Sequence, residues 1–256
     1  MNTIKFLGTA GARFVVMKQL RASGGMWLTL DGTQVLIDPG PGALLRCLAS
    51  RPKLNPMELE GIILTHRHLD HANDINIMIE AMTNGGFKKK GVVFAPQDAL
   101  EGDPIVLKYV RNQVENIEVL KEKGHYTIGH ISFSTPIQHH HGVETYGVNF
   151  LGQHCSLSYI TDTDYFEGLA SYYRGGILVL NVVMLEERKE ISHLCLSEAE
   201  QIIAENKPRL AILTHFGMTM VKAKPWEIAE RLTKKLGVQV IAARDGMTVD
   251  LDQVKK

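Results

Sequence analysis

The chain has 256 residues, of which 45% are hydrophobic, enough to build the core of one large domain. Lys plus Arg number 28 and Asp plus Glu number 28, so the formal net charge is zero. This balance excludes binding of a polyanion through bulk positive charge and leaves only local contacts to nucleic acid. The basic run Lys88–Lys90 follows a glycine-rich turn and is interpreted as a solvated loop.

Neither the cysteines nor the apolar runs indicate an exported or membrane protein. Cys47, Cys155 and Cys195 are widely spaced, so they predict neither a disulfide framework nor a thiolate metal site. The N-terminal residues lack a basic start followed by an apolar leader, and no apolar run approaches the ~20 residues that a membrane span needs. We therefore expect a cytoplasmic protein without membrane contacts.

The first half of the chain alternates short apolar runs with turn formers. Runs rich in branched and aromatic residues predict strands at 3–7, 26–30, 34–37, 61–64 and 91–94. Helices are expected at 41–50, at 73–83, where Ile75, Ile79 and Met82 recur at helical spacing, and near 104–115. A first sheet with covering helices follows from this pattern.

The second half repeats the mixture. Strands are predicted at 117–120, 130–137, 145–151, 156–160, 177–181, 210–214, 238–241 and 247–250. Helices are predicted at 197–206 and 225–236, with Ser197 and Glu200 interpreted as a capping box at the start of the first. No short repeat, linker or break in composition appears, so we predict one domain over residues 1–256, with two sheets covered by helices.

Four side chains able to bind metal lie within six residues. His66, His68, Asp70 and His71 come directly after a predicted strand and before a predicted helix. The two histidines spaced by one residue point to the same side of an extended segment, whereas Asp70 and His71 can turn toward a second position. Burying such groups unpaired would cost several kcal/mol, so structural histidines are a poor explanation. The cluster predicts two adjacent cations.

This run resembles the His-x-His-x-Asp-His motif of the metallo-β-lactamase superfamily at every position. Residues 6–11 and 36–40 look like the strand-and-turn segments that open members of that family. The resemblance implies an α/β fold, a four-layer αβ/βα sandwich of two mixed sheets flanked by helices. It also implies an active site along the shared edge of the sheets.

The resemblance implies a third histidine ligand, for which the run 136–143 offers three candidates. His141 fits best because Gly142 follows it and Tyr146 with Gly147 lies beyond, as in the branch of ribonuclease Z and the small-molecule phosphodiesterases. In a straight strand His139 shares a face with His141, so it is left as a pocket neighbour or a group behind the ligands. His140 faces away.

Two more ligands are implied at strand ends. Asp162 matches the bridging carboxylate, with Asp164 interpreted as a turn residue, and His215 matches the last histidine. The expected sites are His66, His68 and His141 for one ion and Asp70, His71 and His215 for the other, with Asp162 bridging. Two divalent ions are expected, zinc first, with manganese or iron as alternatives. A hydroxide shared by the ions would be the nucleophile, because metal binding lowers the pKa of water toward ~7.

The substrate class must come from residues outside the ligand set. Residues 191–199 resemble the ribonuclease Z and cyclic-phosphodiesterase pattern, which implies a catalytic role for His193 beside Asp70. His193 would protonate a departing alkoxide, since an unperturbed histidine pKa of about 6.5 suits proton transfer near neutrality. A surface histidine beside a helix start is the alternative. The expected activity is hydrolysis of a small-molecule, cyclic-nucleotide or short nucleic-acid phosphodiester.

Several alternatives stay open. Ribonuclease Z itself is disfavoured, because the 20 residues between His141 and Asp162 are taken up by two predicted strands and leave no tRNA-gripping arm. A carboxylic ester, lactone or thioester hydrolase could use the same metals, whereas a metal-bound redox protein would typically carry Glu at the position of His68. Apolar residues after His215 are interpreted as packing under a loop, with pocket lining or a homodimer contact as alternatives; these are Phe216, Met218, Met220 and Val221.

Overall fold

Two seven-stranded sheets pack face to face in the computed structural model, which describes residues 1–153, 155–188 and 190–254. The first sheet has the order β14-β1-β2-β3-β4-β5-β6. Its strands are β1 (Thr3–Phe6), β2 (Met26–Leu30), β3 (Thr33–Ile37), β4 (Gly61–Ile63), β5 (Val92–Pro96), β6 (Asn116–Leu120) and β14 (Thr248–Asp250). Strands β3 to β6 are parallel, and β14, β1 and β2 pair antiparallel at the other side.

The second sheet has the order β13-β12-β11-β10-β9-β8-β7. Its strands are β7 (Gly124–Ile128), β8 (Ile131–Thr135), β9 (Val148–Leu151), β10 (Ser156–Ile160), β11 (Ile177–Asn181), β12 (Leu210–Thr214) and β13 (Gln239–Ala242). Strands β10 to β13 are parallel, and β7 to β9 form an antiparallel meander. Both sheets are therefore mixed.

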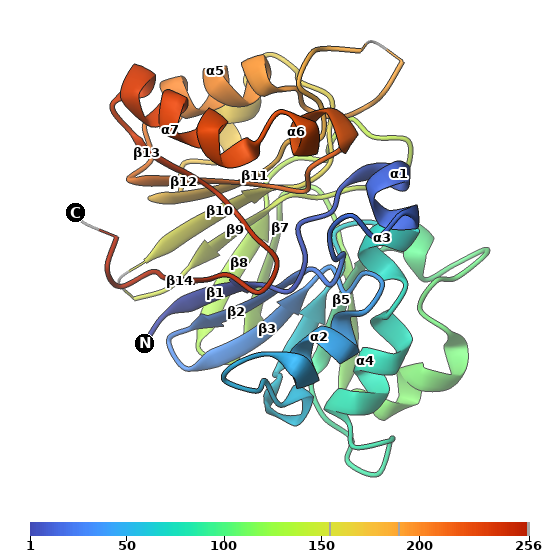
Figure 1. The fold of residues 1–256 in the computed structure, drawn as a ribbon. Helices are drawn as coiled ribbons and strands as arrows, with labels where there is room; N and C mark the ends of the chain where they lie inside the picture. Colours follow the sequence, from blue (N-terminus) through green and yellow to red (C-terminus); the bar gives the residue numbers. More distant parts are fainter. Residues whose placement is uncertain (154, 189, 255–256) are drawn as a thin grey trace.

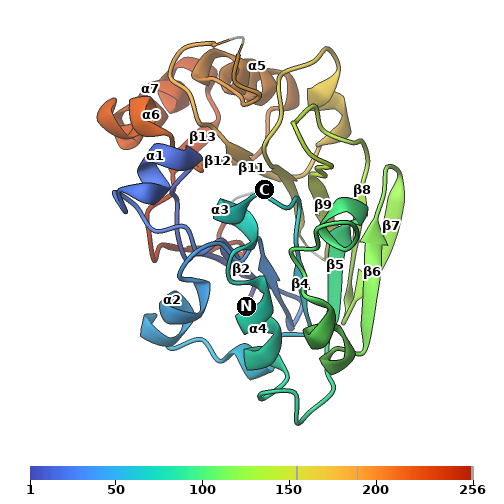
Figure 2. The ribbon, with the colours of Figure 1, turned by 90° about the vertical axis from the view of Figure 1, so that its right-hand side faces the viewer.

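Helices cover the outer faces of the two sheets (Figure 1). The first sheet carries α2 (Ala43–Ala49) and α4 (Ile75–Met82), and the second carries α5 (Leu196–Asn206), α6 (Met218–Lys222) and α7 (Pro225–Leu236). Two short helices, α1 (Ala12–Met17) and α3 (Leu69–Ala72), lie at one end of the sandwich, which faces the viewer in Figure 2. Four 3₁₀ turns complete the described elements: η1 (Pro56–Glu58), η2 (Gln97–Ala99), η3 (Lys108–Gln113) and η4 (Leu169–Tyr172). The expected αβ/βα sandwich is confirmed.

Alternation along the strands fills both sides of each sheet. In β1, Ile4 and Phe6 point into the layer between the sheets, where they join Phe133 and Phe150 of the second sheet. Leu36 of β3 points the other way and packs under the helices. Each such fully buried side chain contributes about 1.5–3 kcal/mol through removal of apolar surface from water. This double burial explains why the central strands read as almost continuous apolar runs.

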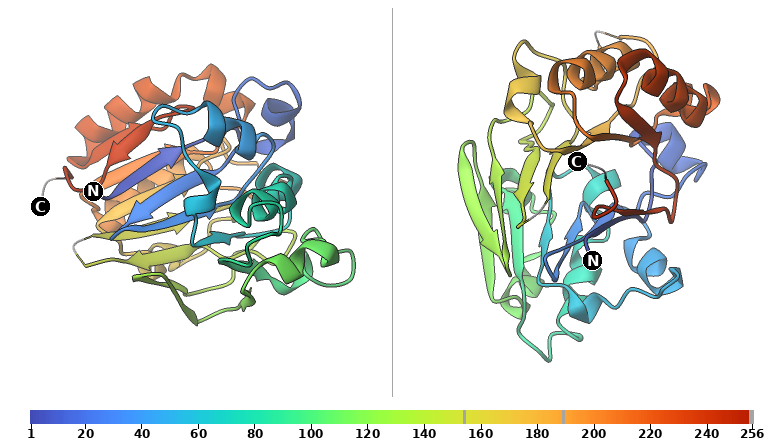
Figure 3. Two further views of the ribbon diagram at one scale, coloured as in Figure 1. Left: turned by 90° about the horizontal axis from the view of Figure 1, so that it is seen from below. Right: turned by 90° about the vertical axis from the view of Figure 1, so that its left-hand side faces the viewer.

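The parallel strands end at one edge, and polar residues follow them there. Asp38 comes after β3, Thr65 and His66 after β4, Asp162 after β10, and His215 after β12. The two ends of the chain lie at the opposite end of the molecule from α1 and α3 (Figure 1 and Figure 3). The edge that carries the polar residues is where an α/β fold places ligands.

Two details of the predicted elements are wrong. Residues 104–115 form only the 3₁₀ turn η3. The carbonyl of Val106, which would accept the N–H of Val110 in an α-helix, accepts from the Arg111 guanidinium, and the N–H of Val110 donates to Leu107 three residues before it. The capping box is not on Ser197 and Glu200. Helix α5 begins at Leu196, and the Glu198 carboxylate accepts the N–H of Cys195 at 2.7 Å.

One strand was not predicted, whereas the cysteines and the lengths of the helices agree with the sequence analysis. Strand β7 was not predicted, since its outward residues His125 and Thr127 are polar and leave few apolar positions to mark it. The three cysteines are free and buried. Within the described ranges, no helix has both the length and the apolar character that crossing a membrane requires.

Candidate metal centre

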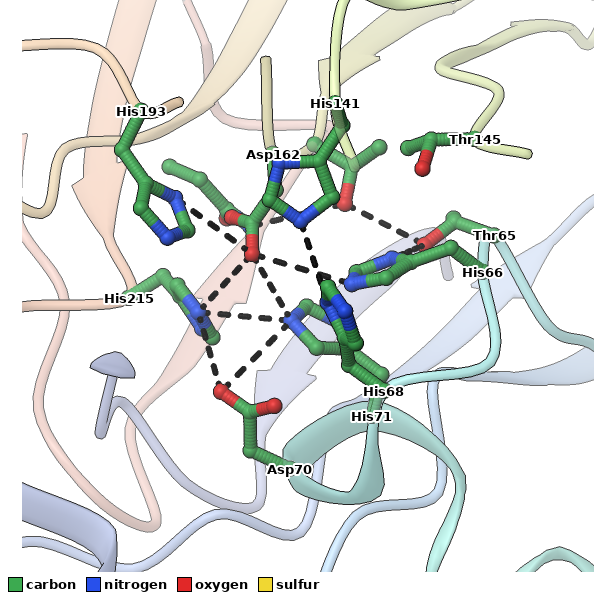
Figure 4. Close-up of polar contacts among 12 residues, drawn as sticks. Thr65, His66, His68, Asp70, His71, His141, Thr145, Asp162, His193 and His215 are labelled. Atoms are coloured by element: carbon green, nitrogen blue, oxygen red, sulfur yellow. Dashed lines mark hydrogen bonds and ion pairs between the residues drawn. The ribbon is translucent and has the colours of Figure 1, made fainter. Parts of the chain in front are cut away.

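The site lies where the ends of both sheets meet (Figure 4). The segment after β4 supplies His66 and His68, and α3 supplies Asp70 and His71. The remaining side chains come from the second sheet and its loops: His141 before β9, Asp162 after β10 and His215 after β12. All seven predicted ligands thus lie in one cluster, and their role as ligands stays a prediction.

The first group of donors consists of three imidazoles. Ligand atoms of His66, His68 and His141 all lie within 4.8 Å of one another. Nε2 of His141 approaches Nδ1 of His68 to 3.0 Å. Because His141 donates its Nδ1–H to the carbonyl of Ser192 at 2.8 Å, its Nε2 presents a lone pair to the site.

The second group combines a carboxylate with two imidazoles. Asp70, His71 and His215 have ligand atoms within the same 4.8 Å limit. Nε2 of His71 lies 3.3 Å from Nε2 of His215, which lies 3.6 Å from the Asp70 carboxylate. Nδ1 of His71 lies 3.0 Å from the carboxylate of Asp38, which only accepts, so Nδ1 keeps its proton and Nε2 is the nitrogen that a cation could use. One face of each group is therefore ready for a cation.

Asp162 stands between the two groups. One oxygen, Oδ2, lies 3.3 Å from Nε2 of His71, 3.5 Å from Nε2 of His215 and 3.8 Å from Nε2 of His66. Burial would raise the pKa of Asp162, but the surrounding imidazoles, His215 first, hold it well below its usual range. The group is thus a buried anion placed where it can bridge two ions.

The hydrogen bonds of His66 show whether the donor set fits a metal ion. Its Nδ1 lies 3.1 Å from the hydroxyl of Thr65, which itself donates to Asp38 and therefore accepts from the imidazole. Its Nε2 is fully buried and has no hydrogen-bond partner, which costs about 1–3 kcal/mol. The 3.8 Å gap to Asp162 is too long for a hydrogen bond but leaves room for a shared cation. The donor set fits.

The protonation states agree with metal binding, which requires neutral imidazoles. Burial lowers the pKa of His66, His68 and His141, so all three present lone pairs near neutral pH. His71 differs: burial opposes its charge, yet Asp38 and Asp162 together raise its pKa well above the usual value. A cation at Nε2 would take the place of that proton.

Two supporting residues were missed by the sequence reasoning. Buried Asp38 accepts the N–H of Thr65 at 2.7 Å and its hydroxyl at 2.8 Å, as well as the Nδ1–H of His71. Asn181 donates from Nδ2 to Oδ1 of Asp162 at 2.8 Å. Both are the polar residues at the ends of predicted strands, and that position was the available signal. They orient the ligands, as groups behind metal sites do.

The open question about the histidine run is resolved by burial. His139 is buried behind the cluster, donating its Nδ1–H to the carbonyl of Asp162 at 3.1 Å and accepting from the Tyr173 hydroxyl at 2.6 Å. Burial lowers the pKa of His139 to about 4. His140 is exposed, with its ring 4.3 Å from that of Phe166. His139 is therefore a group behind the ligands and His140 faces away.

His193 lies at the rim of the cluster. Its side chain is 15% exposed, and its Nδ1 is 3.6 Å from the Asp162 carboxylate, with no hydrogen-bond partner. Burial opposes its charge, but Asp162 and then Asp70 raise the pKa of His193 above the usual value. Its ligand atom also groups with those of His141 and Asp162, so the geometry alone would accept it as a ligand.

Comparison with known proteins shows the family of this chain. Residues 33–216 match the family model described as the β-lactamase superfamily domain. The chain belongs to the metallo-β-lactamase superfamily. An uncharacterized protein of Methanocaldococcus jannaschii, MJ1374, is 30% identical over 259 residues, covering 97% of this chain and 94% of that protein.

Solved structures share the fold over nearly the whole chain. The metallo-β-lactamase fold protein YhfI of Bacillus subtilis has a TM-score of 0.78 at 17% identity, over 97% of this chain and 98% of that one. A diphosphatase of the PhnP family reaches 0.71 at 21% identity, over 98% of both. The short form of human tRNase Z reaches 0.72 at 14% identity, over 97% of this chain and 99% of that one. This superfamily member thus combines the fold with a His/Asp cluster consistent with a dinuclear metal site.

Proposed function

We propose that the protein is a phosphodiesterase with two divalent ions, acting on a small-molecule, cyclic-nucleotide or short nucleic-acid phosphodiester. The observation that carries the proposal is His193, a titratable group at the rim of the cluster whose Nδ1 has no hydrogen-bond partner. Neither group of ligands requires it. Hydrolysis of a diester, in contrast, requires an acid for the leaving alkoxide.

The residues divide between binding ions and moving protons. His66, His68 and His141 would hold one ion, Asp70, His71 and His215 the other, and Asp162 would touch both. When bound, divalent cations lower the pKa of water toward ~7 and offset negative charge on phosphoryl oxygens. Nitrogen and carboxylate donors suit zinc, with manganese or iron as alternatives.

The chain itself supplies two proton-handling groups. Asp162 stabilises the protonated form of His193 from 3.6 Å, so the imidazolium is available near neutral pH to donate to the leaving oxygen. The Asp70 side chain is 19% exposed, and its Oδ2 lies 3.6 Å from His215. That carboxylate faces the cluster and can orient the attacking water or accept its proton. His193 and Asp70 are thus the two groups of this chain that we propose to move protons.

The alternatives use the same centre in other ways. The diphosphatase and the tRNase Z that share the fold act on phosphorus compounds by their names, which supports phosphorus as the electrophile here. Thioester hydrolysis has less need of a separate acid, because the departing thiolate is a stable anion. Ester and lactone hydrolysis expels an alkoxide and could use His193 in the same way, so the substrate screen below separates these classes from the diester. A redox role is disfavoured by His68, whose Nδ1 lies with His141 in the first donor group.

A substrate screen tests the proposal. The metal-loaded protein is assayed against an activated aryl phosphodiester, the matching monoester, a β-lactam, a lactone and a thioester. We expect the largest kcat/KM for the diester. A larger value for the lactone or thioester would assign the protein to the alternative hydrolase class.

A further inference from the structure

A second polar pocket lies away from the metal centre, between α2 and the β1–β14 side of the first sheet. Its volume is about 240 Å³, and its charged lining residues are Lys5, Arg46 and Arg51. No carboxylate lines it. Helix α2, which carries Arg46, lies against the outer face of the sheet in Figure 1. None of these residues takes part in the metal centre.

Lys5 is the unusual member of this pocket. The alternation of β1 places Ile4 and Phe6 in the core and turns Lys5 to the outer face, where it is only 6% exposed. Its ammonium donates to the carbonyl of Gly246 at 3.2 Å, the Thr248 hydroxyl at 3.1 Å and the carbonyl of Arg51 at 3.5 Å.

All three acceptors of the Lys5 ammonium are neutral. Within the part of the chain that the structure describes, Lys5 forms no ion pair with a carboxylate. A buried ammonium without a counter-charge is costly, and a lysine that only filled space could be replaced by an apolar residue. An anion in the adjoining pocket would supply the missing charge.

The two arginines can complete such a site. Arg46 is exposed in the last turn of α2, and among the described residues its guanidinium has no hydrogen-bond or ion-pair partner. Arg51 donates from Nη1 to the carbonyls of Ala49 and Ser50, which leaves the other nitrogens of its guanidinium for a ligand. Guanidinium groups bind tetrahedral oxyanions through paired N–H donors.

We propose that this pocket binds a phosphate group, either inorganic phosphate or the terminal phosphate of a phosphomonoester. Three cations converge on it from β1, α2 and the loop after α2, and one of them is buried without an anionic partner. The volume accommodates a tetrahedral anion with part of an attached group. The pocket would recognise the phosphate by positive charge and N–H donors. Because none of its residues belongs to the metal cluster, phosphate binding there should not require bound metal.

Equilibrium dialysis of the metal-loaded protein against labelled inorganic phosphate tests the site. The double variant Arg46→Gln and Arg51→Gln should bind one phosphate fewer per chain than the wild type, or bind it at least about tenfold more weakly. The matched control, Lys88→Gln with Lys89→Gln, removes the same charge from an exposed loop and should bind as the wild type does. Phosphate bound at the metal centre is common to all three proteins and cancels.

Two further measurements complete the test. Lys5→Met should also weaken phosphate binding at least about tenfold while metal content stays at the wild-type value; if it does not fold, the arginine variant still decides. Competition with a nucleoside 5′-monophosphate distinguishes the two sources. If the nucleotide displaces labelled phosphate at concentrations below the dissociation constant for phosphate, the site is one for a phosphomonoester. If higher concentrations are needed, it is a site for free phosphate. Equal phosphate binding by the wild type and the arginine variant, or an equal loss in the lysine control, would overturn the proposal.

Discussion

The metal centre has a buried side and an open side, and the chain holds them by different means. On the buried side, formed by His66, His71 and Asp162, no residue is more than 2% exposed. Their remaining polar atoms are bound by side chains, among them the carboxylate of Asp38 and the amide of Asn181. The buried side is thus fixed by a charged network that crosses between the two sheets.

On the open side, formed by His68, His141 and His193, the support is backbone. His141 is oriented by the carbonyl of Ser192, the residue directly before His193. Nδ1 of His193 has no hydrogen-bond partner, and the ring centroid of His193 lies 5.1 Å from that of His141. From this contrast we expect changes behind the buried side to weaken metal binding and a change of His193, on the open side, to affect proton transfer.

The largest effect is expected where the two sides meet. Asp162→Ala removes the carboxylate whose Oδ2 faces three imidazoles, so both charge stabilisation and the position of the nucleophile are lost. Turnover of a diester should fall at least about 10⁴-fold, together with loss of bound metal. Asp164→Ala is the matched control, since Asp164 lies outside the cluster and should keep wild-type turnover. Wild-type turnover of Asp162→Ala would remove it from the bridging position.

On the open side, His193→Ala should separate chemistry from metal binding. Loss of a positioned acid lowers turnover by roughly 10²- to 10⁴-fold on a poor alkoxide leaving group, with metal content unchanged. With a nitrophenolate leaving group, already stable as an anion, the loss should shrink to less than about tenfold. Equal losses on the two substrates would assign His193 to substrate binding or loop structure. Loss of metal would instead make it a ligand.

On the buried side, Asp38→Asn should weaken metal binding and leave the chemistry of the loaded centre unchanged, the reverse of the result expected for His193→Ala. The amide cannot serve as an anionic acceptor for the Nδ1–H of His71, so that ligand loses its orientation and part of its basicity. Metal affinity should fall by about 10- to 100-fold, measured by competition with a chelator. The loss in turnover should disappear at saturating metal. Asp164→Asn controls for the charge change, and an unchanged affinity in Asp38→Asn would break the proposed division of roles.

Behind the cluster, His139 should make stability depend on pH. Its pKa is lowered to about 4 in the folded chain, whereas an exposed histidine titrates near ~6.5, so between these values only the unfolded chain binds the proton. Stability is therefore lost as the pH falls through that window. Replacement by Gln should reduce the loss between pH 7.5 and 5 by about 2 kcal/mol in urea unfolding. His140→Gln should show the pH dependence of the wild type. If the stability of His139→Gln falls with pH as steeply as that of the wild type, the lowered pKa of His139 is not the cause.

The parts predictable from sequence are those encoded locally. The run His66–His71 indicated the centre because its six residues carry four donors. The resemblance to the metallo-β-lactamase superfamily then pointed to Asp162 and His215, each at the end of an apolar strand. Asp38 was not recognised as support, because its partners Thr65 and His71 lie 27 and 33 positions away and no local period links them. Spacing likewise left His139 open, since only burial behind Asp162 distinguishes it from a pocket residue.

Local rules also misplaced some elements for physical reasons. Residues 104–115 were predicted as a helix, yet the Arg111 guanidinium takes up the carbonyls of Leu100 and Val106, which leaves only 3₁₀ pairing in this segment. Phe216, and Met220 of α6, are fully buried in the same core cluster as residues of α7, which agrees with their interpretation as packing. Tertiary hydrogen bonds and burial, which a single sequence does not display, decided both cases.

Elemental analysis of the fully loaded protein decides whether the centre holds two ions with Asp162 between them. We predict two transition-metal ions per chain in the wild type, with activity lost when His66 or His215 is changed to Ala because each change opens the set of ligands around an ion. No more than one ion per chain in fully loaded wild-type protein would rule out a dinuclear centre.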